Sequence, residues 1–176
     1  MSDDRLTKVG GKLVHRGPIA SVRMETFQYA DGSRATRQVV VHPGAVCVIP
    51  HDGRVIYMVE QPREAVEEPA LLELPAGKLD VEGEAPLECA QRELAEEIGK
   101  SAGDWRELKA FYTSPGFATE RVHLFLATEL YDVPSEPDEG ERIEVVEVPL
   151  DELDGAIERC EDAKSLVGLL MLKELR

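Results

Sequence analysis

Apolar and polar residues alternate along much of the chain with the period of two that is typical of strands. Residues 20–29 and 35–42 show this period on either side of the turn sequence ADGS, which predicts an N-terminal hairpin. Nearly continuous apolar runs at 45–50 and 55–61 predict a second hairpin, central in a sheet because both faces of its strands are apolar. Further strand signals lie at 105–114, 122–130 and 142–149.

The period changes to that of a helix in residues 85–98. Pro86 suits the first helical turn and Gly99 is a natural stop. One stripe of this helix carries the apolar residues Leu87, Ala90, Leu94 and Ile98. A last helix, with a break, is expected from about Asp151 to the C-terminus. The segment 62–77, with three prolines, is expected to be irregular.

Composition narrows the class of protein. A chain of 176 residues, 43% of them hydrophobic, is long enough for one packed domain. Its net charge of −15 argues against general binding to nucleic acid or to an anionic membrane, which need an excess of Lys and Arg. Three scattered cysteines suggest neither disulfides nor a zinc site, and no signal peptide or membrane span is seen. We therefore expect a soluble, cytoplasmic protein.

Four carboxylates gather around the predicted helix and raise the question of what holds them. Glu93 and Glu97 lie one turn apart near the C-terminal end, where like charges and the helix dipole both disfavour them. Each such like-charge pair costs about 0.2–0.5 kcal/mol unless a cation lies between them. A hard divalent cation such as Mg2+ would remove the conflict. The alternative is a solvated helix in which Arg92 pairs with Glu88 and Glu96.

The stretch GEAPLECAQRELAEEIG favours the metal interpretation, because its spacing resembles the Nudix box of hydrolases that cleave nucleoside diphosphates linked to another group. Glu84 is followed by seven residues, Arg-Glu-Leu, one residue, Glu-Glu, one residue and Gly. Two positions depart from the pattern. Six residues instead of five separate Gly77 from Glu84, where we expect a local bulge, and Lys100 replaces the final aliphatic residue.

The resemblance implies an α/β (α+β) Nudix fold, a mixed β-sheet sandwiched between helices, with an N-terminal antiparallel strand arm. It also implies a magnesium or manganese cofactor (Mg2+ or Mn2+). Glu84 would orient the site, and Arg92 would hold the loop through carboxylate pairing. The metal ligands it implies are Glu93, Glu97, Glu96 and the backbone carbonyl of Ala76.

Three further stretches, HPGAVCVIP, VEQPREAVEEPALLELPAGK and FYTSPGFATERVHLFLATEL, resemble ADP-ribose pyrophosphatases. This similarity implies Mg-dependent hydrolysis of ADP-ribose to AMP and ribose 5-phosphate. Three alternatives stay open: a Nudix hydrolase of another nucleotide sugar or dinucleotide such as GDP-mannose or NADH, a non-catalytic nucleotide-binding module, and an acidic protein-interaction surface. The small-molecule partner expected is a nucleoside diphosphate sugar, without nucleic acid or membrane.

The resemblance also suggests substrate-binding residues. Arg63 matches a position that contacts the diphosphate, although it could instead pair with Glu64 or Glu67. The base that activates water would be Glu141 or Glu120. Asp80 and Phe117 are further candidates for binding the substrate, although Phe117 could instead be a core phenylalanine after a tight turn. Arg37, with Arg34 and Tyr29, is the candidate for the adenosine end. Residues 1–42 would form a β arm that helps a homodimer form, and 43–176 the hydrolase domain.

Overall fold

A computed structural model of the chain describes residues 6–134 and 142–176. The described chain divides into two compact units. Of the described residues, one unit contains 6–44 and 112–121, and the other contains 45–111, 122–134 and 142–176. Each unit is described by itself below. Among the described residues, no helix is both long enough and apolar enough to cross a membrane.

The first unit is built on a three-stranded antiparallel sheet in the order β1-β2-β3. Strands β2 (Ser21–Tyr29) and β3 (Arg34–Val41) pair across a turn in which Gly32 has a positive φ of 80°. This pairing confirms the predicted N-terminal hairpin. Strand β1 (Leu6–Arg16) was not predicted, because Gly10 and Gly11 interrupt its pattern and every residue of it is exposed.

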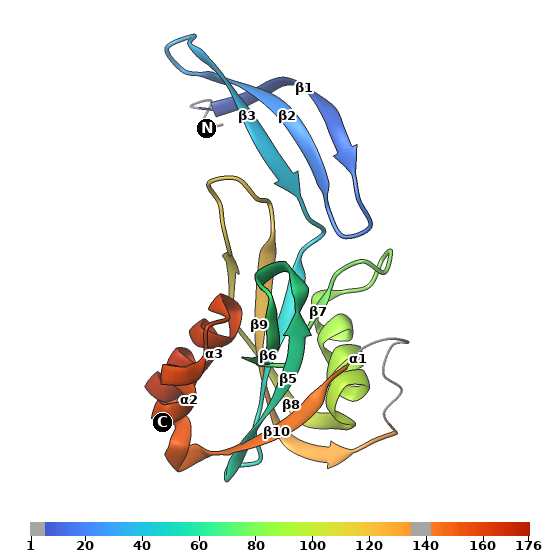
Figure 1. The fold of residues 1–176 in the computed structure, drawn as a ribbon, viewed down its shortest axis with the longest axis vertical. Helices are drawn as coiled ribbons and strands as arrows, with labels where there is room; N and C mark the ends of the chain where they lie inside the picture. The colour runs from blue at the N-terminus through green and yellow to red at the C-terminus, as the bar shows by residue number, and fades with distance from the viewer. Residues whose placement is uncertain (1–5, 135–141) are drawn as a thin grey trace. The chain divides into compact units, whose positions relative to one another are not determined.

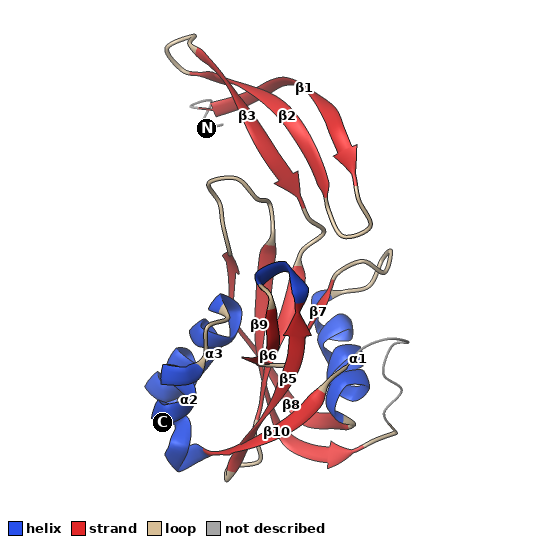
Figure 2. Cartoon of the chain, in the orientation of Figure 1, coloured by secondary structure: helices blue, strands red, loops and turns tan. Residues whose placement is uncertain are grey.

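The second unit holds two sheets, drawn in Figures 1 and 2. The four-stranded sheet has the order β7-β4-β9-β8, and it is mixed because β4 runs parallel to β9 and antiparallel to β7. The three-stranded sheet has the order β10-β5-β6 and is antiparallel. The strands are β4 (Ala45–Pro50), β5 (Val55–Arg63), β6 (Glu68–Glu73), β7 (Ala76–Lys78), β8 (Lys100–Tyr112), β9 (Arg121–Asp132) and β10 (Glu144–Pro149).

Two predictions about this unit were wrong. Strands β4 and β5 do not form a hairpin, because they belong to different sheets and share only the bridge between His51 and Ile56. An apolar run shows that a strand is buried on both faces, but it does not show which strand lies beside it. The segment 62–77 is also not irregular, since it forms β6, β7 and a short 3-10 helix, η1 (Glu64–Val66).

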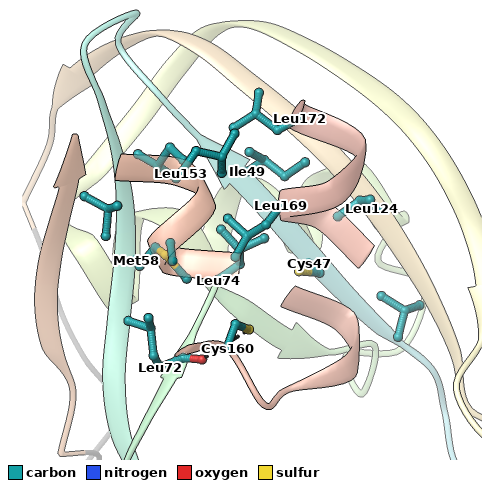
Figure 3. Close-up of a cluster of buried hydrophobic side chains, with 14 of the residues drawn as sticks. Cys47, Ile49, Met58, Leu72, Leu74, Leu124, Leu153, Cys160, Leu169 and Leu172 are labelled. Carbon is teal, nitrogen blue, oxygen red and sulfur yellow. Dashed lines mark hydrogen bonds between the residues drawn. The ribbon is translucent and has the colours of Figure 1, made fainter. Parts of the chain in front are cut away.

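Helices cover both sides of the strands, as the resemblance implied (Figure 2). Alternate residues of β4 separate two cores: Cys47 and Ile49 belong to one, Val46 and Val48 to the other. The first core is closed by the C-terminal helices and is drawn in Figure 3. The second is closed by α1. The helices are α1 (Pro86–Ile98), the 3-10 turn η2 (Leu150–Glu152), α2 (Leu153–Arg159) and α3 (Ala163–Leu175), which confirms a broken last helix.

Candidate active site

Helix α1 begins and ends through local contacts that its sequence provides. The backbone N–H of Ala85 donates to the Glu88 carboxylate at 2.9 Å, and Pro86 occupies the first turn. Gly99 ends the helix in the left-handed conformation, with its N–H directed to the carbonyls of Leu94 and Ala95. Leu87, expected on the apolar stripe, is instead 38% exposed, and Cys89 is buried in the core facing α1.

The loop before α1 takes up the additional residue of the box in a turn. The Glu84 N–H donates to the carbonyl of Val81 at 3.2 Å, and Gly83 adopts a φ of 83°. The bulge expected here is thus a tight turn that leaves the register of the helix unchanged. Lys100, at the other departure, pairs with Asp132 and lies 4.5 Å from the ring centroid of Tyr57, so it covers apolar surface despite its charge.

Arg92 gathers three of the predicted site carboxylates. Its Nε and Nη2 donate to the two oxygens of Glu84 at 2.9 and 3.1 Å, and its Nη1 donates to Glu93 and Glu96, each at 2.8 Å. The bond to Glu84 is the main cause that raises the pKa of Arg92. The same bond lowers the pKa of Glu84. Of the two pairings in the solvated-helix alternative, the one between Arg92 and Glu96 is present, whereas Glu88 accepts from the backbone N–H of Ala85.

The carboxylates of Glu93 and Glu97 face strand β7. Glu97 is 8% exposed, and its Oε2 accepts a hydrogen bond from the backbone N–H of Ala76 at 3.0 Å. A Cβ placed on Gly77 would lie 1.8 Å from Cδ of Glu93. The missing side chain of Gly77 therefore gives the Glu93 carboxylate its place against the backbone. Strand β7, through Ala76 and Gly77, thus contacts Glu93 and Glu97 of α1, although the strand and these glutamates are far apart in the sequence.

Arg63, at the end of β5, pairs with a residue that sequence reasoning did not single out. Its Nε and Nη2 donate to the two oxygens of Glu73 at 2.5 and 2.9 Å, so the alternative partners Glu64 and Glu67 are wrong. Glu73 is 1% exposed and also accepts from Lys164. The sequence does contain one sign that Glu73 is paired, because it is an acid inside the apolar run LLELP. A carboxylate buried in such a run needs partners.

Arg63 also lies within electrostatic reach of the helix carboxylates. The hydrogen bond to Glu73 is the largest cause that raises the pKa of Arg63, and the charges of Glu73, Glu97 and Asp162 add to it. Glu97 thus acts on Arg63 across the space between α1 and β5. This half-exposed cation beside an acidic helix is suited to a ligand that carries both phosphate and metal.

The remaining described candidates come from both units. Asp80 forms an exposed pair with Lys78 at 3.2 Å in the second unit. In the first unit, Phe117 is 58% exposed, so the alternative of a core phenylalanine is wrong. Glu120 accepts from the Thr113 hydroxyl at 2.6 Å. Arg37 lies on β3 and donates to its neighbour's carbonyl. Glu141 lies outside the described residues.

The site therefore offers carboxylate oxygens on α1 and the guanidinium of Arg63 at the end of β5, whose pKa the charge of Glu97 helps to raise. Within residues 6–134 and 142–176, no group of three or more His, Cys, Asp or Glu side chains has the arrangement of a metal-binding site. Arg92 pairs with Glu84, Glu93 and Glu96, so an ion bound by these side chains would share their carboxylates with Arg92. Oxygen donors of this kind suit Mg2+ or Mn2+, not a soft metal.

Comparison with known families identifies the class of protein. The sequence pattern of the NUDIX domain matches residues 41–167, a span that contains β4 to α2, the beginning of α3 and the whole carboxylate group. The chain belongs to this family, and the expected fold is confirmed. A solved structure described as an ADP compounds hydrolase shares the fold with a TM-score of 0.85 and 24% identity, covering 97% of this chain and 94% of that one.

Two relatives are similar over nearly the whole chain. The ADP-ribose pyrophosphatase of Bacillus subtilis (strain 168) is 41% identical over 174 residues, which cover 94% of this chain and 92% of the relative. The methanol dehydrogenase activator of Bacillus methanolicus is 35% identical over 166 residues, covering 91% of this chain and 88% of the relative. Both alignments extend beyond the box into the strands around it, so the similarity is that of whole proteins.

Proposed function

We propose that this protein is an ADP-ribose pyrophosphatase that splits ADP-ribose, with a divalent cation, into AMP and ribose 5-phosphate. The observation that carries the proposal is 41% identity to the Bacillus subtilis enzyme over 94% of the chain. The intact carboxylate set on α1 supports a catalytic protein over a binding module that has lost its chemistry. Arg63, a half-exposed guanidinium near Glu97, supports a diphosphate substrate.

We propose Mg2+ or Mn2+ as the cofactor, held by Glu93, Glu97, Glu96 and the backbone carbonyl of Ala76. The donor set fits a hard cation, since all of these atoms are oxygens. The close approach of Glu93 to Gly77 supports the same assignment, because it places a carboxylate beside the Ala76 peptide. When bound, the ion would offset phosphate charge and lower the pKa of a water molecule.

The chain's own residues would bind and orient the substrate. Arg63 donates to the diphosphate, where a charge-assisted hydrogen bond both positions the bridge and offsets the charge that develops during attack by water. Arg92 and Glu84 keep the loop before α1 in place through their paired hydrogen bonds. Asp80, Arg37 and Phe117 remain proposed substrate contacts, and Glu141 or Glu120 the proposed base.

The test is release of AMP from ADP-ribose. We expect turnover with Mg2+ and loss of turnover when a chelator is added. A panel that includes GDP-mannose and NADH should give its highest kcat/KM with ADP-ribose. If GDP-mannose or NADH were clearly preferred, the proposed substrate would be wrong.

Glu97→Gln tests the ligand assignment within the same assay. The amide oxygen can still accept from the Ala76 N–H, so the fold should persist. Turnover should fall by at least about a hundredfold, because even residues one shell outside a metal change activity by about 10–100-fold. Full activity in a folded variant would contradict the assignment.

We also propose a homodimer formed through the first unit. Its sheet leaves large apolar side chains exposed on β1 and the following turn, and exposed apolar groups of this kind mark interaction surfaces. They are Leu6, Val9, Leu13, Val14 and Ile19. A second copy of the chain is the proposed partner.

A further inference from the structure

Arg63 belongs to a cluster of four charged residues, and the proposed function uses only Arg63 of these four. It consists of Arg63 from β5, Glu73 from β6, and Asp162 and Lys164 at the start of α3. Both carboxylate oxygens of Glu73 accept from Arg63, and one of them, Oε2, also accepts from Lys164. Lys164 also donates to Asp162 at 2.9 Å. Two acids and two bases thus form one connected chain.

Exposure divides the two cations of this cluster. The Arg63 side chain is 41% exposed, whereas that of Lys164 is 16% exposed and that of Glu73 is 1% exposed. Lys164 therefore faces the protein interior, and Arg63 is the member that can meet a ligand from solvent. Burial alone would lower the pKa of Lys164, but the charges of Asp162 and Glu73 outweigh burial and raise the pKa, so the side chain stays charged.

Helix α3 also fixes the backbone next to Glu73. The N–H of Leu74 donates to the Ser165 hydroxyl at 2.7 Å, and that hydroxyl donates to Asp162 at 2.5 Å. Two residues further along, the N–H of Ala76 donates to Glu97. The first turn of α3 therefore holds Glu73 by its side chain, through Lys164, and by the following peptide, through Ser165.

We propose that Lys164 is a positioning residue for the diphosphate site, which acts by sharing the Glu73 carboxylate with Arg63. This inference rests on the proposed function. A carboxylate with one cationic partner would offset most of the charge of Arg63 and hold it inward. When Glu73 is shared by Arg63 and Lys164, it offsets less of the positive charge of the exposed Arg63 guanidinium, which then attracts phosphate oxygens more strongly. Because β6 carries Glu73 and α3 carries Lys164, these two elements set the direction of the guanidinium.

A purely stabilising role for Lys164 makes a different prediction. Removing one partner of a buried ion pair commonly lowers stability, because the other charge is left without compensation. If stability were the whole role, Lys164→Met would unfold at lower temperature but bind a diphosphate as well as before. Affinity measured on folded protein separates the two roles.

The experiment measures the Kd of ADP by calorimetry in the presence of Mg2+, which does not depend on ADP-ribose being hydrolysed. Lys164→Met should weaken binding about tenfold, the effect expected when one charge-assisted hydrogen bond to phosphate is impaired. Lys164→Arg, which keeps the charge, should stay within about threefold of the wild type. For ADP-ribose, KM should rise in Lys164→Met more than kcat falls.

Lys173→Met is the matched control. Lys173 lies on the same helix and pairs with Asp154 at 2.7 Å, but both side chains are largely exposed. Its removal should change neither Kd nor KM. Unchanged ADP affinity in folded Lys164→Met, or no binding of ADP by the wild type, would overturn the inference. A wild type that binds ADP but releases no AMP from ADP-ribose would count against the proposed function alone.

A second pair of variants keeps the test decisive if Lys164→Met does not fold. Glu73→Gln combined with Lys164→Met removes one charge of each sign, so Glu73 is not left as a buried carboxylate without its lysine. Asp162 also loses Lys164, but it still accepts two hydrogen bonds from Ser165. Because Lys164 acts through Glu73, adding Lys164→Met to Glu73→Gln should change Kd by less than about twofold. A further tenfold loss in that background would show that Lys164 does not act through Glu73.

Discussion

Gly77 serves the site by having no side chain. Its backbone has an ordinary φ, so conformational freedom is not the reason for a glycine here. The reason is space, since the Glu93 carboxylate occupies the position that a Cβ would take. One residue on β7 thus decides where one carboxylate of α1 can lie.

Gly77→Ala should therefore reduce activity without unfolding the protein. The atoms in the way form the end of a flexible side chain, which can turn aside at little cost. Displacing Glu93 by about 1 Å would reduce kcat/KM about a hundredfold, the usual cost of such a misplacement. The Tm should change by only a few degrees.

Gly155→Ala is the control for this variant. It adds the same methyl group on α2, where nothing lies within 4 Å, and should leave activity unchanged. Wild-type kcat/KM in Gly77→Ala would show that the position of Glu93 does not matter for turnover.

Local pairings at the residue scale could be predicted only when the partners are close in sequence. The spacing of Arg92 and Glu96 predicted their ion pair, which the structure shows. For Arg63, the alternative to a diphosphate contact was a pair with its neighbours Glu64 or Glu67, but it binds Glu73, ten residues away on the adjacent strand. The order of strands in the sheet, which brings these two residues together, is not written in the local sequence.

At the scale of elements, α1 was predictable and the sheet arrangement was not. Proline at the first turn, glycine at the end and an apolar stripe all act within one helix, so they can be read along the chain. The partners of β4 are β7 and β9, which lie 26 and 71 or more residues further on. Pairing over such distances depends on how the whole domain packs.

Helix α3 approaches β4 closely because residue 168 is a glycine. A Cβ on Gly168 would lie 2.5 Å from Cδ1 of Leu74 and 3.3 Å from carbon atoms of Ile49 and Leu124. Gly168→Ala should therefore destabilise the protein by about 1–3 kcal/mol through overpacking. The free energy of unfolding from urea titration measures the change.

Gly155→Ala again provides the comparison, because the same exchange in the open position on α2 should stabilise a helix by about 0.5–1 kcal/mol. Equal stabilisation of both variants would mean that the space beside Gly168 is larger than the contacts of α3 indicate.

At the scale of the whole molecule, the charge of −15 and the acidic helix do not conflict with an anionic substrate. In the proposed function, attraction would be supplied locally, by Arg63 and by the proposed cation, while the overall charge discourages general binding to polyanions. The net charge by itself implies this need for a local source of positive charge. It could not predict that the arginine would be set against a buried glutamate and a lysine.

Assembly is the prediction that belongs to the whole molecule. If the exposed apolar residues of the first unit are covered by a second copy, light scattering should give twice the chain mass of 19.5 kDa. Leu13→Lys with Val14→Lys should shift the protein toward monomer, since each buried lysine would cost at least about 1–3 kcal/mol.

Val145→Lys, at a similarly exposed position on β10, should leave the mass unchanged. A wild type of 19.5 kDa at all concentrations would contradict the proposed assembly.

Strand β4 has one more consequence, for how the second unit loses its structure. All six of its residues are buried, and successive side chains enter opposite cores, so this strand is a wall common to both. Melting on either side would remove the surface against which the other side packs. The two cores therefore cannot unfold one after the other, and heating should unfold both together in one cooperative transition.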